Sequence, residues 1–156
     1  MSPNLSNDPN APNVPNDSND LRASFVRRCD TIEEAYEFML AYAAQGLEGD
    51  TTRGSGGQLR EFLTRAASAL TGIGDLLDAV IDQQRLEPAD RYRAYASVLD
   101  RDARDSLAAI DIVLAQPSIS SQLVDNLNAS IHLRALLTDL FLIDEILKGP
   151  GLRPQG

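Results

Sequence analysis

The sequence predicts an all-α fold: an antiparallel four-helix bundle, preceded by a short extra N-terminal helix and a disordered N-terminal tail. Three observations support this prediction. Apolar residues recur at helical spacing from residue 21 onward. Proline, which marks helix boundaries, is absent between positions 16 and 87. Valine, isoleucine and threonine never alternate with polar residues over the length of a strand, so no sheet is expected.

The N-terminal segment, residues 1–20, has the composition of a disordered tail. Asparagine recurs at every third position from Asn4 to Asn19 and is interleaved with proline. Only Leu5 and Val14 are large aliphatic residues, so the segment cannot bury enough apolar surface to offset the entropy lost on ordering. The expected organisation is a disordered Asn/Pro-rich tail at 1–20, a helical bundle domain at 21–148 and a flexible C-terminal tail at 149–156.

Two helices are expected in the first part of the bundle domain. A short one covers residues 20–28. Asp30 and Thr31 are each followed by a glutamate three residues later. Either pair can form a capping box, so a second helix is predicted to begin here. Gly46 ends this second helix, because glycine is the usual residue just past a helix C-terminus.

The next two helices are long. Apolar residues from Leu59 to Val80 step alternately by four and three, which is the seam spacing of left-handed bundle packing. Gly72 and Gly74 lie inside this helix and mark either a kink or a close contact with another helix. Pro88, at a first-turn position, begins the following helix.

The last helix begins after Ser118 or Ser120, continues to Lys148, and is apolar on two sides. One stripe supplies the bundle core: Leu133, Leu136, Leu137, Leu140, Ile143 and Leu147. A second stripe consists of Ile131, Ala135, Leu142 and Ile146. A helix that is apolar all round is normally buried all round, so the second stripe predicts a homodimer interface across a two-fold axis. The alternative is that the short helix at 20–28 covers it.

Composition excludes several classes of function. The net charge of −9 leaves no basic face for nucleic acid. One Cys, one His and no Trp exclude most metal sites, internal disulfides and most nucleophile–base pairs, so we expect neither a cofactor nor an enzyme. No apolar run is long enough for a membrane span or a signal peptide, which favours the cytoplasm. Lys148 is the only lysine against thirteen arginines, a skew typical of GC-rich bacterial genes.

Two polar residues of the last helix, His132 and Asn128, are the candidate functional residues. Asn128 lies one helical turn before His132 and within reach of it. A lone histidine on a bundle helix suggests a phosphotransfer domain, in which a basic residue follows the histidine by three positions and a small residue by four. Here Arg134 follows His132 by two positions, and the large Leu136 follows it by four, so the pattern does not match. A di-iron site needs two Glu-x-x-His pairs, and Ala129 occupies the glutamate position. Cys29 is interpreted as a small apolar residue because no base or second cysteine accompanies it.

Three functions remain in order of preference. The first is a non-catalytic interaction protein, a regulatory or accessory factor that works through a dimeric bundle surface and also binds another protein. The second is a small-molecule sensor whose core opens around an apolar ligand, although the absence of aromatic residues between Tyr95 and Phe141 argues against it. The third is a histidine phosphotransfer protein.

Overall fold

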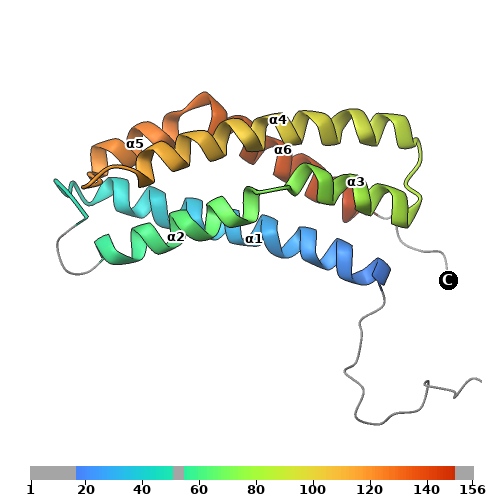
Figure 1. Cartoon of the computed structure of the whole chain (residues 1–156), viewed down its shortest axis with the longest axis horizontal. Coiled ribbons are helices and arrows are strands. Elements are labelled where there is room, and N and C mark those ends of the chain that lie inside the picture. The colour runs from blue at the N-terminus through green and yellow to red at the C-terminus, as the bar shows by residue number, and fades with distance from the viewer. Residues whose placement is uncertain (1–16, 51–54, 150–156) are drawn as a thin grey trace, which may run out of the picture.

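The computed structural model describes residues 17–50 and 55–149 (Figure 1). These residues form six α-helices and no strand, so the all-α prediction is confirmed. The helices are α1 (Asp17–Ala44), α2 (Ser55–Leu70), α3 (Ile73–Gln84), α4 (Ala89–Leu114), α5 (Ser121–Ala129) and α6 (Ile131–Leu147). The predictions for the two tails fall largely on residues 1–16 and 150–156, which lie outside the described residues.

Helix α1 is continuous, so the expected short helix at 20–28 and the expected boundary after it are wrong. The buried side of α1 runs without interruption from Phe25 through Cys29 to Ile32. The Thr31 hydroxyl donates to the backbone oxygen of Arg27 at 3.0 Å, one turn back, instead of capping a new helix. A capping sequence inside a continuous apolar stripe therefore remains helical, because packing of the stripe outweighs the local signal.

The long helix expected from the apolar spacing between Leu59 and Val80 is divided into α2 and α3. Gly72 adopts a left-handed conformation with φ of 73°, which ends α2 and precedes α3. A Cβ atom added to Gly74 would lie 2.4 Å from the Cβ of Asp100, so α3 packs against α4 without room for a side chain. The two glycines thus have different roles: Gly72 marks the break and Gly74 the close contact.

The last helix is also divided. Ser120 caps α5 by accepting a hydrogen bond from the Leu123 backbone N–H at 3.0 Å, as predicted. Ser130 then adopts an extended conformation and caps α6 by accepting from the Leu133 N–H at 3.3 Å. The expectation of one helix continuing to Lys148 is therefore wrong, whereas α4 begins immediately after Pro88 as predicted.

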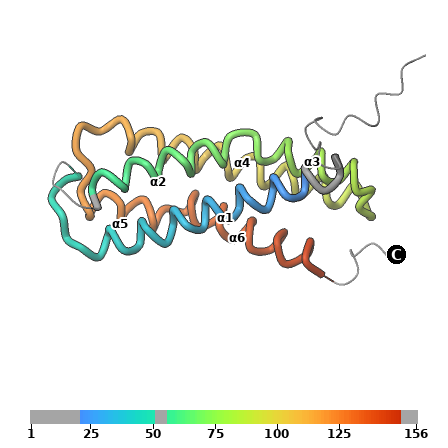
Figure 2. Tube along the Cα trace, turned by 90° about the horizontal axis from the view of Figure 1, so that it is seen from below, coloured from blue at the N-terminus to red at the C-terminus, as the bar shows by residue number. Residues whose placement is uncertain are grey.

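The six helices enclose one elongated core. Helix α1 packs against α2, α3 and α5, while α4 packs against α2, α3 and α6. Figures 1 and 2 show that α2 and α3 follow one another along the molecule, and so do α5 and α6. Within the described residues, no helix has both the length and the apolar character needed to cross a bilayer.

An ion pair between the buried Asp50 and the partly buried Arg60 joins segments at one end of the molecule. Asp50 is 8% exposed, and its carboxylate accepts hydrogen bonds from the Arg60 guanidinium and from the Ile119 backbone N–H at 2.6 Å. Arg60 also donates to the backbone oxygens of Leu114 and Gln116 at 3.1 and 2.8 Å. This cluster fixes the turn after α4 against the start of α2.

Candidate functional site

The predicted second stripe lies on the outer side of α6. Ile131, Leu142 and Ile146 are 75%, 51% and 40% exposed, and Ala135 is half-buried. We call these four residues the outer face of α6. The opposite side of the helix belongs to the core, where Leu136 and Leu140 are fully buried. The part of α1 at residues 21–28 leaves Ile131, Leu142 and Ile146 exposed, so it does not provide the alternative cover.

Polar residues border the outer face in an uneven distribution of charge. Arg134 lies near the N-terminal end of α6, and Glu145 lies near its C-terminal end. Both side chains are exposed, and neither forms an ion pair with another described residue. Thr138 lies between them, and its hydroxyl donates to the Arg134 backbone oxygen at 2.9 Å. Phe141, 54% exposed, was not predicted as part of this surface.

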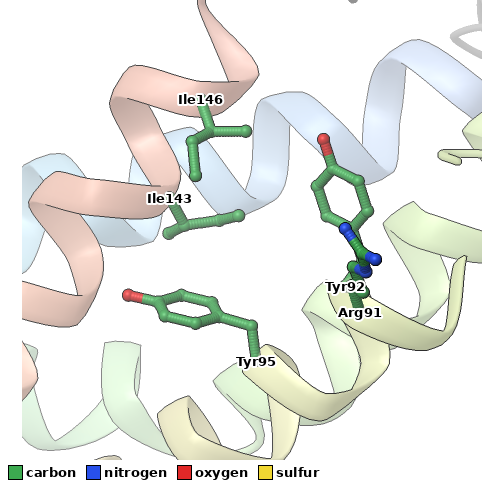
Figure 3. Close-up of a pocket in the computed structure, with 5 residues that line it drawn as sticks. All are labelled: Arg91, Tyr92, Tyr95, Ile143 and Ile146. Carbon is green, nitrogen blue, oxygen red and sulfur yellow. The ribbon is translucent and has the colours of Figure 1, made fainter. Parts of the chain in front are cut away.

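An apolar groove of about 230 Å³ lies between the start of α4 and the end of α6. Its lining residues are Arg91, Tyr92, Tyr95, Ile143 and Ile146. Figure 3 shows Ile143 and Ile146 pointing from α6 toward the two tyrosines of α4. Ile146 belongs both to this groove and to the outer face of α6, so the two features are continuous. The groove could not be predicted from the sequence, because the tyrosines meet α6 only through the packing of two distant segments.

A pair of acidic residues lies between α4 and α6, next to the groove. Asp139 is 9% exposed, and its Oδ2 atom has no hydrogen-bond donor among the described residues. Burial raises the pKa of Asp139 to about 7, and the neighbouring Asp102 carboxyl adds to this effect through hydrogen bonding and its negative charge. The Tyr95 hydroxyl donates to the Asp139 backbone oxygen at 2.8 Å, which connects the pair to the groove.

The raised pKa of Asp139 predicts a pH-dependent gain in stability for Asp139→Asn. The native carboxyl holds a proton that the unfolded chain releases above about pH 4, so wild-type stability falls between about pH 4 and 7. The amide carries no charge at any of these pH values. We expect Asp139→Asn to be more stable than wild type by about 2 kcal/mol at pH 8, and nearly equal to it at pH 5.

Urea denaturation at the two pH values measures this difference. Asp111→Asn, at an exposed position of α4, is the matched control and should have the same effect at both. A stability difference for Asp139→Asn that does not change with pH would contradict the raised pKa of Asp139.

The structure does not bring the two candidate polar residues together. The side chain of His132 is 52% exposed, and its Nδ1 atom lies 4.0 Å from a carboxylate oxygen of Asp105. Asn128 is buried and donates to the backbone oxygen of Met39 at 3.2 Å. Ser130 is extended between α5 and α6, so the two residues do not lie one turn apart on a continuous helix as expected.

The remaining candidates are the thiol of Cys29 and clusters of side chains that could bind a metal ion. Cys29 is 1% exposed, and its burial, with a further contribution from Asp144, raises the pKa of the thiol to about 12. In the ranges 17–50 and 55–149, no group of three or more His, Cys, Asp or Glu side chains is placed to hold a metal ion. Comparisons of the chain with protein families, with curated proteins and with solved structures find no match.

Proposed function

We propose that the protein is a non-catalytic interaction protein, a regulatory or accessory factor that acts as a homodimer through the outer face of α6. One observation carries the proposal: three large apolar side chains of this face are exposed on a helix whose other side is already core. Burying such side chains yields about 25 cal/mol per Å² of apolar surface. A two-fold contact buries the same set twice, so few residues per chain are enough to begin an interface.

The proposal includes a finer description of the architecture. The six helices form an antiparallel four-helix bundle. In it, α2 and α3 together take the place of one helix, and α5 and α6 together take the place of another. The dimer works in the cytoplasm of a bacterium and presents its acidic remaining surface to another protein. His132 is exposed on α6, whereas Cys29 is buried on α1, and this difference in burial supports a role that does not involve catalysis.

A small-molecule sensor is the second candidate, and the groove between α4 and α6 favours it. Tyr92 and Tyr95 supply the aromatic wall that such a pocket usually has. The volume of about 230 Å³ is below the range of roughly 300–1,000 Å³ that ligand pockets occupy, and the groove is open to solvent. We therefore place the interaction protein first.

The substitution Leu142→Glu tests the proposed homodimer. It places two uncompensated carboxylates in the contact, and we expect the dimer to weaken by about 100-fold or more. Light scattering coupled to size-exclusion chromatography at micromolar concentration should give the monomer mass of 16.9 kDa, with unchanged helical content by circular dichroism.

Leu40→Glu provides the matched control for this experiment. Leu40 lies on α1 and is 47% exposed, close to the 51% of Leu142, but it is not on the outer face of α6. This variant should keep the wild-type mass. If both glutamate variants keep the dimer mass, another surface forms the dimer, and a monomeric wild type would refute the proposal.

A further inference from the structure

The two ends of α6 carry complementary apolar features. Ile131, at the start of the helix, is 75% exposed and projects from the surface. Ile146, near the other end, forms part of the groove with Tyr92 and Tyr95. At a rise of 1.5 Å per residue these two isoleucines are about 22 Å apart. Ile131 therefore cannot reach the groove of its own chain, but Ile131 of a second copy can.

The spacing of the outer face suits direct contact between two α6 helices. Exposed or half-buried residues step by four, three and four along this side: Ile131, Ala135, Thr138 and Leu142. Such a heptad spacing is the seam of a left-handed helix pair. The two central positions hold the small side chains of Ala135 and Thr138, which allow the helix backbones to approach closely. An antiparallel pair centred beside Thr138 places Ile131 opposite the partner's Ile146.

The charges bordering the outer face select this antiparallel direction. In an antiparallel pair, residues on one flank of a helix meet the same flank of the partner. Arg134 then lies beside the partner's Glu145, and Glu145 lies beside the partner's Arg134. In a parallel pair the corresponding flanks lie on opposite sides of the contact, so Arg134 and Glu145 would have no charged partner across it.

We infer that two copies of this chain pair through antiparallel α6 helices about a two-fold axis near Thr138, with Ile131 of each copy seated in the Tyr95–Ile146 groove of the other. The inference rests on the proposed homodimer and specifies its geometry. It also assigns the groove: the occupant is an isoleucine of a second copy, and the aromatic wall formed by the tyrosines contacts that side chain.

Engineered disulfides test the direction and the pairing. In a Cys29→Ala background, the double variant Ile131→Cys/Ile146→Cys should form a covalent dimer on mild oxidation. The single variant Ile131→Cys should not, because the two copies of residue 131 lie about 22 Å apart in an antiparallel pair. A disulfide needs Cα atoms within about 7 Å, which also prevents a link between positions 131 and 146 of one chain. Leu40→Cys gives the background rate of chance oxidation.

The possible results separate the inference from the homodimer on which it rests. Covalent dimer from the double variant alone supports the antiparallel pair. Efficient linking of the single Ile131→Cys variant, or a dimeric mass with linking of neither, overturns the inference and leaves the homodimer intact. A monomeric mass for every variant overturns both. A stoichiometric small-molecule adduct on the wild type that is lost in Tyr95→Ala would assign the groove to a ligand instead.

A charge exchange provides an independent readout. Arg134→Glu and Glu145→Arg should each weaken the dimer by about 10-fold at low salt, because each turns two attractions into two repulsions. The double variant Arg134→Glu/Glu145→Arg should regain the wild-type dissociation constant. Loss that persists in the double variant would overturn the antiparallel pairing, and helical content by circular dichroism shows that each variant remains folded.

Discussion

Replacement of Asp50 by alanine is expected to destabilise the protein by about 3–5 kcal/mol, the largest effect of any single side chain considered. The Asp50 side chain is 5% exposed, and its carboxylate compensates the Arg60 guanidinium and the Ile119 backbone N–H. Without it, the buried Ile119 N–H loses its acceptor, and the partly buried Arg60 guanidinium loses its counter-charge and keeps only the backbone oxygens of Leu114 and Gln116. Urea denaturation at pH 7 measures the loss, with the exposed Asp125→Ala of α5 as the control.

The same carboxylate predicts a stability loss at acidic pH. Burial alone would raise the pKa of Asp50, but the hydrogen bonds from Arg60 and Ile119 outweigh it and hold the pKa below its ordinary value. The stability that Asp50 contributes is therefore present above about pH 4 and is lost as the pH falls through the lower native pKa. The Asp50→Ala variant should lack this part of the acid transition. An unchanged acid transition, or a loss below 1 kcal/mol, would show that the cluster is not an anchor.

Gly74→Ala is expected to have the second largest effect, a loss of about 3 kcal/mol. The added methyl group would lie 2.4 Å from the Cβ and 2.8 Å from the Cα of Asp100, and the backbone of α4 cannot move away without disturbing its own packing. This loss exceeds the gain of about 1 kcal/mol that alanine normally gives over glycine inside a helix.

Gly57→Ala is the control, because nothing lies within 4 Å of the position of its Cβ. Gly57 is in the first turn of α2, and the substitution should be neutral or slightly stabilising. Thermal or urea denaturation of both variants checks the pair of expectations. A neutral Gly74→Ala would mean that α3 and α4 are not in the close contact described.

Sequence periodicity was sufficient for the helical content and for some boundaries, but not for the breaks. Pro88 and Ser120 begin helices as expected because proline and a capping serine act locally. The capping residues around Thr31 have the same local signal, yet they lie inside α1, where the buried stripe continues past them. Ser130 shows the opposite case: it lies inside a continuous helical pattern, yet it is extended and its side chain caps α6.

The candidate surface was predictable only in its simplest part. The outer face of α6 follows from spacing within one helix, so the exposure of Ile131 and Leu142 could be anticipated. The groove and the acid pair depend on the register of α4 against α6, which places Tyr95 beside Asp139 across 44 positions of sequence. No periodicity within either helix contains that register. It is set by the whole core, including the close contact at Gly74.

The mass of the intact chain in solution tests the proposed homodimer most directly. Light scattering over a series of dilutions from high to low micromolar concentration should give twice 16.9 kDa at the upper end, with dissociation on dilution and a monomer throughout for Leu142→Glu. A wild-type mass of 16.9 kDa at the highest concentration would contradict the homodimer and leave the outer face of α6 without the partner proposed for it.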